Sequence, residues 1–244
     1  MRLLLANANT THAITLACAE VARAAAAPGT EILPATPSFG PAVISSRAEE
    51  AIAAHGLLDL LARYAGEVDA VLLAVSLDTA LEAARQLMPC PVVGMTEAAC
   101  FIACLLGTRF GLVTFGATGA YRDRIAQHGL AGRCAALVGV ATTPQAALAD
   151  PEGTDRLVLQ GIDRAVAEGA EAVVMGGAAL AGAAARLQPR SPVPLVDGIA
   201  AGVKLAEALV ALRPVKPRTG GLAPLSGRES VGLSAPLAAL LRGG

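Results

Sequence analysis

The chain has few aromatic side chains and no strong charge of either sign. Aromatic residues make up 2% of its 244 residues and tryptophan is absent, although 54% of the residues are hydrophobic. Its core must therefore be built from Ala, Val and Leu, which suits helices packed closely on buried parallel strands. The formal net charge is −1, with no basic stripe or acidic block. We therefore expect no nucleic-acid or membrane partner, and a small neutral or anionic molecule as the ligand.

Several other signals are also missing. No apolar run reaches the ~18 residues of a membrane span, and the N-terminus turns polar at Asn7, too soon for a signal peptide, so we expect a cytoplasmic protein. The 5 cysteines lack metal-ligand spacing, which predicts free thiols and no metal site. The motifs GxxxxGK, HExxH and GxSxG are absent, so nothing supports a P-loop nucleotide site, a zinc protease or an α/β-hydrolase.

What the sequence does contain is an internal repeat of three segments in the same order. Each segment is an apolar run that ends in small or polar residues; the pairs are residues 3–10 with 111–118, 69–76 with 171–178, and 91–96 with 194–199. The repeat predicts two similar halves. We expect the first to comprise residues 1–94 plus about 205–244, and the second residues 95–204.

Short apolar runs alternate with stretches rich in Ala, Leu, Glu and Arg. The runs predict parallel strands buried on both faces, near residues 2–6, 30–34, 70–75, 91–94, 110–114, 136–140, 172–176 and 194–196. The stretches between them predict helices over residues 11–27, 48–64, 79–87, 97–106, 120–128, 155–168, 180–187 and 199–212. The expected fold is therefore α/β, with two pseudo-symmetric, doubly wound parallel-sheet domains.

Ligands of doubly wound sheets bind outside the carboxyl ends of the strands. The predicted strand ends carry Asn7 to Thr11, Val75 to Thr79, Gly94 to Glu97, Thr114 to Thr118, Gly177 to Ala179, and Asp197-Gly198. We expect the two halves to face each other, so that these segments line one cleft. The last part of the chain is rich in turns from Arg213 and apolar from 234 to 241. We expect it to pack on the surface or against a second subunit of a homo-oligomer.

Ten residues at the strand ends are candidates for ligand binding: Asn7, Asn9, Thr10, Val75, Thr79, Thr114, Gly116, Gly177, Ala178 and Asp197. The amides and hydroxyls that open the first helix suit a carboxylate or an imide oxygen, although simple N-capping would explain one or two of them. Asp78 and Glu97 either cap helices or act as acid/base groups, and Ser76 is left to face the cleft. Cys100 and Cys104 lie on an apolar helix and are expected in the core.

Several segments together resemble the aspartate/glutamate/hydantoin racemase superfamily, and within it the hydantoin and allantoin racemase branch. The likeness spans almost the whole chain. Its segments are Leu5 to Thr11 for the family's N-P-N-T-S opening, Gly40-Pro41, Pro91 to Ala99, Arg109 to Thr114, Tyr121-Arg122, Gly129-Leu130, Pro194 to Gly198, and Val203 to Ala208.

The resemblance implies a catalytic mechanism that this chain cannot follow unchanged. Enzymes of the family need no cofactor and use two cysteines, one at a strand end in each half, to remove an α-proton from one face and return it to the other. The family's A-C-F-D-D-P and G-C-A-G segments correspond to residues 74–79 and 176–179, so the cysteine positions fall on Val75 and Gly177. A relative, arylmalonate decarboxylase, has glycine at one such position and decarboxylates its substrate, but it keeps one cysteine.

Three functional hypotheses follow. The first is a cofactor-independent enzyme acting at a carbon acid of a small carboxylate, imide or cyclic ureide, by racemisation or decarboxylation, with Ser76, Asp78, Glu97 or a bound water in place of the thiols. The second is a non-catalytic protein that binds such a ligand. The third is a conventional racemase that uses other residues, including Cys100 or Cys104.

Overall fold

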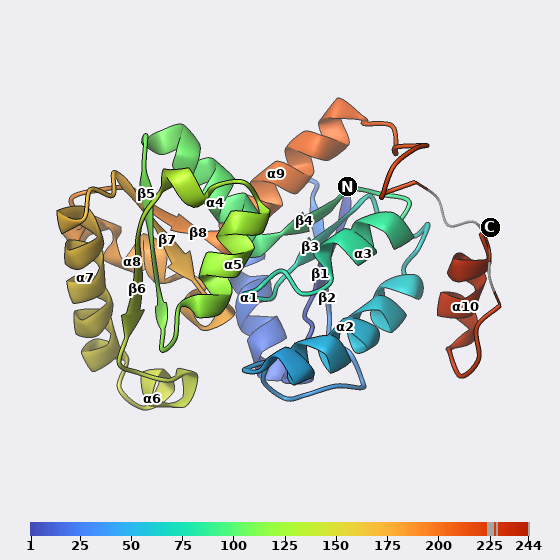
Figure 1. Ribbon diagram of the computed structural model, residues 1–244, viewed down its shortest axis with the longest axis horizontal. Coiled ribbons are helices and arrows are strands. Elements are labelled where there is room, and N and C mark those ends of the chain that lie inside the picture. Colours follow the sequence, from blue (N-terminus) through green and yellow to red (C-terminus); the bar gives the residue numbers. More distant parts are fainter. Residues whose placement is uncertain (224–226, 228, 244) are drawn as a thin grey trace. The chain divides into compact units, whose positions relative to one another are not determined.

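The computed structural model of the chain describes residues 1–223, 227 and 229–243. It divides into two compact units, Met1–Gly94 with Gly202–Gly244, and Met95–Ala201. Each unit holds one four-stranded, entirely parallel sheet with helices on both faces (Figure 1). The predicted α/β class with two parallel sheets is confirmed.

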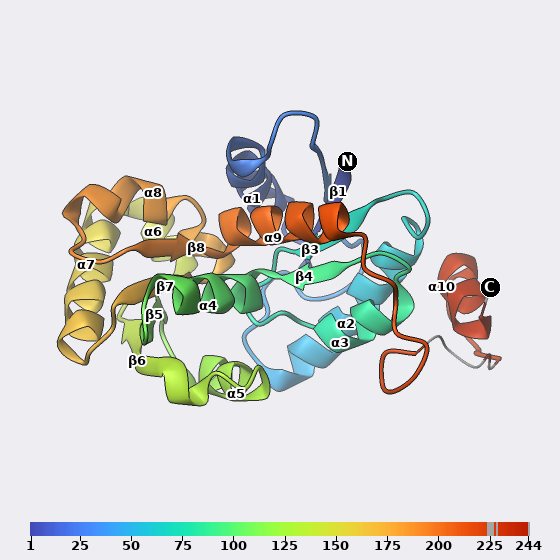
Figure 2. The same cartoon turned by 90° about the horizontal axis from the view of Figure 1, so that it is seen from above.

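The first unit has the strand order β2-β1-β3-β4. Its strands are β1 (Arg2–Ala6), β2 (Glu31–Ala35), β3 (Ala70–Leu73) and β4 (Val92–Gly94). Its helices are α1 (His12–Ala25), α2 (Arg47–Ala62), α3 (Leu81–Leu87), most of α9 (Gly198–Leu212) and α10 (Ala235–Arg242). Helices α1 and α9 cover one face of this sheet, and α2 and α3 cover the other (Figure 2).

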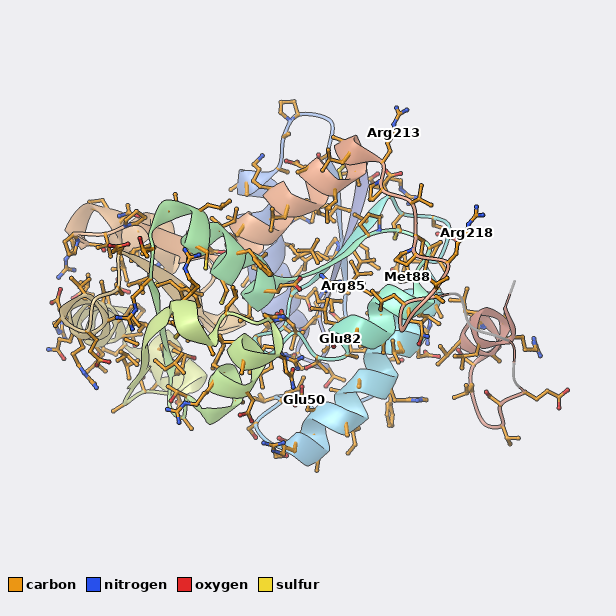
Figure 3. The ribbon with its side chains drawn as sticks, turned by 45° about the horizontal axis from the view of Figure 1, so that its top comes forward. Glu50, Glu82, Arg85, Met88, Arg213 and Arg218 are labelled. Atoms are coloured by element: carbon orange, nitrogen blue, oxygen red, sulfur yellow. The ribbon has the colours of Figure 1, made fainter. Side chains whose placement is uncertain are left out.

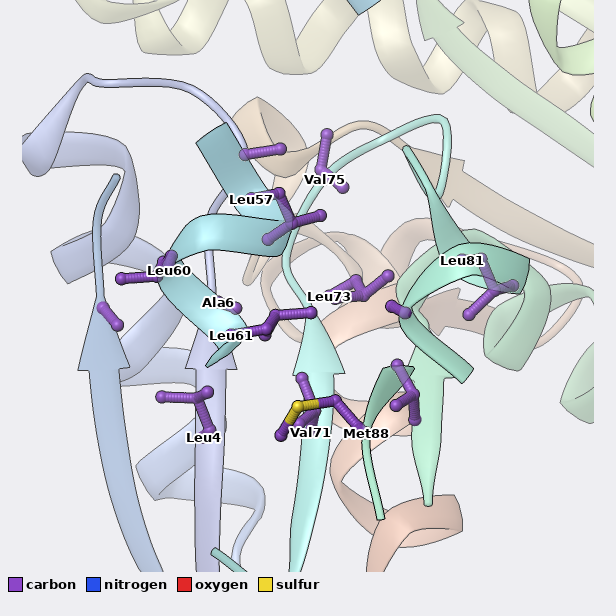
Figure 4. Packing of buried hydrophobic residues seen from close by; sticks show 14 of the residues in the cluster. Leu4, Ala6, Leu57, Leu60, Leu61, Val71, Leu73, Val75, Leu81 and Met88 are labelled. Atoms are coloured by element: carbon purple, nitrogen blue, oxygen red, sulfur yellow. The ribbon is translucent and has the colours of Figure 1, made fainter. Parts of the chain in front are cut away.

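Side chains of the first sheet alternate between its two faces. Leu4 and Leu73 point to the same side as Leu57 of α2, in a cluster of buried aliphatic residues (Figure 4). On the opposite side, α9 lies so close to the sheet that a Cβ on Gly202 would overlap the side chain of Leu72. Each fully buried leucine contributes ~1.5–3 kcal/mol to stability, so an interior without tryptophan is sufficient for a stable core.

The second unit repeats this arrangement with the strand order β6-β5-β7-β8. Its strands are β5 (Phe110–Phe115), β6 (Cys134–Val140), β7 (Ala172–Gly176) and β8 (Leu195–Asp197). Its helices are α4 (Met95–Leu106), α5 (Gly119–Gln127), α6 (Pro144–Ala149), α7 (Pro151–Ala167) and α8 (Ala183–Leu187). Helix α7 packs tightly on the sheet because Gly161 has no side chain; a Cβ there would lie 3.0 Å from methyl groups of Val113 and Val140.

Equivalent strands of the two units carry the sequence repeat. The three repeated segments form β1 and β5, β3 and β7, and β4 and β8, which hold the same places in the two strand orders. In each sheet the second strand of the unit pairs with one side of the first strand, and the third strand pairs with its other side. The carboxyl ends of β1 and β3, and of β5 and β7, are therefore topological switch points, where doubly wound sheets bind their ligands.

The C-terminal part of the chain is fastened to the first unit at two places. The Lys216 ammonium group donates hydrogen bonds to the carbonyls of Gln86 (2.5 Å) and Met88 (2.9 Å) at the end of α3, while Arg213 and Arg218 point away from that helix (Figure 3). Farther on, α10 packs on α2 through buried Leu237. The apolar stretch from 234 to 241 is thus a helix on the surface of its own unit. Within the described residues, no helix combines the length and the apolar character needed to cross a membrane.

Candidate functional site

The loop after β1 is shaped by its two asparagines. The backbone N–H of Asn9 donates to Oδ1 of Asn7 (3.1 Å), and the backbone N–H of Thr11 donates to Oδ1 of Asn9 (3.0 Å). The Asn7 amide in turn donates to Asn9 Oδ1 (3.0 Å). Asn7 is completely buried and Asn9 keeps 8% of its surface exposed. Thr11 is the N-cap residue of α1, but its side chain accepts no hydrogen bond from the helix. The polar side chain that acts here is that of Asn9, which accepts from the backbone N–H of Thr11.

The same loop presents hydrogen-bond donors toward solvent. Both hydrogen bonds of the Asn9 amide end on Oδ1, and within the described part of the chain Nδ2 donates to no protein acceptor, so its N–H groups are available to a ligand. Thr10 is anchored by its backbone, whose N–H donates to the Pro41 carbonyl (3.0 Å) in the Gly40-Pro41 element. An amide NH₂, a hydroxyl and a helix N-terminus at one strand end suit a ligand that offers oxygen acceptors.

The segment after β3 has an uncommon backbone. Asp78 and Ala80 have φ angles of 50° and 57°, a left-handed conformation that costs non-glycine residues about 1–2 kcal/mol each. Helix α3 consequently begins only at Leu81, with Ala80 as its N-cap. The predicted helix start at residue 79 is wrong for this reason, and of the two alternatives for Asp78 the N-cap is not the one that the structure has. Backbone strain of this kind gathers at functional sites.

Side chains of the same segment differ sharply in exposure. Val75 is 5% exposed, Asp78 and Thr79 are completely buried, and Ser76 is half-buried. The Asp78 carboxyl group lies against the end of β4, where a Cβ on Gly94 would be 2.6 and 2.8 Å from its two oxygens. The Thr79 hydroxyl is buried without a hydrogen-bond partner among the described residues. The β3 end therefore holds a buried carboxylate and an unsatisfied hydroxyl beside a valine.

In the second unit, the candidates lie at the paired ends of β5 and β7. Thr114 is buried and pairs with Gly176 in the sheet, and Gly116 (φ 66°) turns the chain into the exposed loop before α5. Gly177 directly follows β7 with φ 128° and ψ 138°, and Ala178 begins a short 3-10 turn. The Gly177 backbone has a conformation that residues with a Cβ rarely adopt.

Asp197 organises this strand end and has little freedom to bind a ligand. One carboxylate oxygen accepts from the backbone N–H of Gly182 (2.6 Å), and the other from Ile199 (2.8 Å) and Ala200 (3.1 Å). The carboxylate thus joins the loop after β7 to the first turn of α9, as acidic groups do at helix N-termini. This bond also explains why α8 begins at Ala183 and not at the predicted residue 180.

Glu97 has a neighbour that sequence reasoning missed. Glu97 lies in the first turn of α4, and its carboxylate is 3.7 Å from Nδ1 of His128, which follows α5. Both side chains are largely buried, and the His128 ring lies 6.5 Å from the ring of Phe101. His128 was predicted only as the end of a helix, and no sequence pattern connects a residue after α5 with one 31 positions earlier.

The five cysteines lie away from the strand ends considered above. Cys18 and Cys100 are buried within α1 and α4, and Cys90 and Cys134 lie close to the amino ends of β4 and β6. Cys104 lies near the end of α4 and is half-buried, so the predicted core position is correct for Cys100 but wrong for Cys104. Burial raises the pKa of Cys90 to about 11 and also raises those of Cys104 and Cys134. These three groups are therefore thiols, not thiolates, at neutral pH. Nor does the described part of the chain gather three or more His, Cys, Asp or Glu side chains into a possible metal site.

Comparison with known proteins gives a consistent result. The sequence model of the family described as Asp/Glu/Hydantoin racemase matches residues 3–206. The hydantoin racemase of Pseudomonas sp. (strain NS671) is 35% identical over 219 residues, 87% of each chain. The structure of allantoin racemase from Pseudomonas fluorescens superposes with a TM-score of 0.91 at 33% identity, covering 95% of this chain and 100% of that one. Allantoin racemase from Klebsiella pneumoniae gives 0.88 at 36% identity, with 98% of each chain covered.

Proposed function

The chain belongs to the Asp/Glu/hydantoin racemase family, and we propose that it is a cofactor-independent enzyme acting at a carbon acid of a small carboxylate, imide or cyclic ureide. The similar proteins named hydantoin and allantoin racemase support this class of ligand. The donors at the β1 end support it as well, because a carboxylate or an imide carbonyl offers the oxygen acceptors that they require.

We further propose that the reaction does not use a pair of thiols. The observation that carries this proposal is the nature of two residues shortly after β3 and β7, a buried Val75 and a Gly177 with φ 128°, which the resemblance of the sequence segments places at the family's cysteine positions. The remaining cysteines do not substitute for them, because they lie inside helices or near the amino ends of strands. Cys100 and Cys104 thus lose their role as alternative catalytic groups.

A carboxylate is the best replacement for the first thiol. Asp78 follows β3, the strand beside β1, and is buried next to Gly94. In the proposed step the carboxylate accepts the proton of the activated C–H bond, and the electron pair of that bond moves into the adjacent carbonyl to give an enolate. Donors at the β1 end would hydrogen-bond the enolate oxygen. Return of a proton to the carbon completes the reaction, and Ser76, which also follows β3, is the further candidate for that transfer.

A first experiment separates chemistry from binding. The purified protein is incubated in D₂O with allantoin, substituted hydantoins, amino acids and substituted malonates, and each compound is followed by proton NMR. Loss of an α-proton signal or formation of a decarboxylated product supports the enzyme. Asp78→Asn keeps the size and the tolerance for a left-handed backbone, so it should abolish turnover and leave binding in place. Asn9→Ala should weaken binding.

The absence of thiols after β3 and β7 also favours a second candidate, a protein that binds the same ligands without transforming them. In that case the D₂O experiment gives no exchange, while one or more of the compounds still raises the melting temperature, and Asp78→Asn has no functional consequence. If no compound exchanges, reacts or raises the melting temperature, both candidates are excluded for these ligand classes.

A further inference from the structure

A chain of hydrogen bonds runs behind the β1 loop of the first unit. The Asn7 amide donates to the Thr15 hydroxyl (3.0 Å), which lies 2.7 Å from the Thr36 hydroxyl, which lies 3.2 Å from Nδ1 of His12. The residues come from three elements: the loop after β1, helix α1 and the end of β2. The chain begins at an exposed imidazole and ends at a completely buried amide.

The direction of these hydrogen bonds follows from the backbone. Backbone N–H groups can only donate, and those of Asn9 and Thr11 point at the Oδ1 atoms of Asn7 and Asn9. Both amides therefore have one possible orientation. The Asn7 NH₂ group donates to Asn9 Oδ1 and to the Thr15 hydroxyl at 3.0 Å each, and its contact with the Thr11 carbonyl is longer, at 3.5 Å. Thr15 is therefore an acceptor there, and its own proton is available to Thr36.

Burial makes the Thr15 link energetically important. Asn7 and Thr15 are both 0% exposed, so water cannot replace a lost partner of the Asn7 amide. An unpaired buried N–H group is costly, and the least costly response is a rotation of the Asn7 side chain. Such a rotation breaks the bond to Asn9 Oδ1, so the Thr11 backbone N–H then holds the Asn9 amide alone and its orientation is less firmly fixed.

We propose that Thr15 and Thr36 are positioning residues that hold the Asn9 amide in the orientation that receives an acceptor oxygen of the ligand. The inference rests on the proposed function, because it assigns the ligand to the β1 end. It also specifies the ligand chemistry there: the group bound by Asn9 is a carbonyl or carboxylate oxygen and not a donor such as a ring N–H.

The test compares Thr15→Val, Thr15→Ser and Thr36→Val with a control, Thr154→Val, which removes a buried threonine hydroxyl from α7 of the second unit. Dissociation constants are measured for allantoin, 5-benzylhydantoin and phenylmalonate. Thr15→Val should weaken binding roughly tenfold and Thr36→Val less, because it leaves Asn7 paired. Thr15→Ser and the control should bind as the wild type does. Unchanged binding by a folded Thr15→Val protein overturns the proposal.

A second readout needs no ligand. Hydrogen exchange of the asparagine side-chain amides, followed by NMR, should be slow for Asn7 and fast for Asn9, and Thr15→Val should accelerate exchange at Asn7 while Thr15→Ser does not. If the wild type binds none of the three compounds, the proposed function fails for them. The exchange rate of the Asn7 side-chain amide then decides by itself whether Thr15 fixes the orientation of the two asparagine amides. Equal Asn7 exchange in Thr15→Val and wild type refutes the positioning role. If Thr15→Val does not fold, Thr15→Ala, which also removes the hydroxyl, replaces it in both comparisons.

Discussion

Placing a side chain at Gly177 should destabilise the protein. With φ 128° and ψ 138°, any residue with a Cβ must strain the backbone, at a cost of about 1–3 kcal/mol, or the loop must change conformation. For a chain of this length each kcal/mol lowers the melting temperature by roughly 2–4 °C. Gly177→Cys and Gly177→Ala should therefore melt about 2–12 °C below the wild type.

The comparison between these two variants isolates the cause. Thermal and urea unfolding should give similar losses for Gly177→Cys and Gly177→Ala, because both add a Cβ and only one adds a thiol. Val75→Cys changes a buried side chain by little more than one methyl group and should cost only ~1 kcal/mol. If both Gly177 variants unfold at the wild-type temperature, the backbone argument is refuted. A folded double variant, Val75→Cys with Gly177→Cys, then tests whether thiols at these two positions racemise a hydantoin.

Three further variants test other parts of the structure. Ala80→Gly should raise the free energy of unfolding in urea by about 1 kcal/mol, because glycine adopts the left-handed N-cap without strain; an unchanged or lower value contradicts the strain. Asp155 forms a bidentate pair with Arg186 (2.7 and 2.9 Å), and these hydrogen bonds lower the pKa of the carboxyl from its ordinary 3.8. The pair therefore stabilises the fold above pH 3.8, and this contribution is lost as the pH falls through the lowered pKa of Asp155. Asp155→Asn should make the free energy of unfolding fall less steeply as the pH is lowered. An unchanged pH dependence contradicts the pairing. Asp197→Ala should accelerate hydrogen exchange at the Gly182 amide at least tenfold, and equal protection would show that the carboxylate does not hold this loop.

Most strands could be predicted because they are buried on both faces. Runs such as Leu3 to Ala6 and Ala172 to Gly176 consist of apolar residues that end abruptly in polar or small ones, and the structure places β1 and β7 at the predicted residues. Helix starts were harder to predict. Helix α7 begins at Pro151 behind the Asp150 cap, four residues before its predicted start, although an Asp-Pro pair is a recognisable start signal.

The candidate site was predictable in its position along the chain but not in the roles of its residues. Strand ends follow from the apolar pattern, whereas the direction of an amide depends on which backbone N–H groups surround it. Asn9 and Asp197 illustrate the difference, because both lie near strand ends. The Asn9 side chain keeps its NH₂ group as a donor, whereas the Asp197 carboxylate accepts from backbone N–H groups of its own loop and helix. The left-handed backbone at Asp78 has no sequence signal, because neither it nor its neighbours is glycine.

Because both units contain cysteines, chemical labelling can measure the local opening of each unit separately. Cys18 belongs to the first unit and Cys100 to the second, and both side chains are completely buried. Alkylation in the native state must therefore wait for local opening of the surrounding structure. Mass spectrometry of a timed alkylation reaction would give separate opening rates for the two units of one unmodified molecule, and the reagent would attack no thiol after β3 or β7.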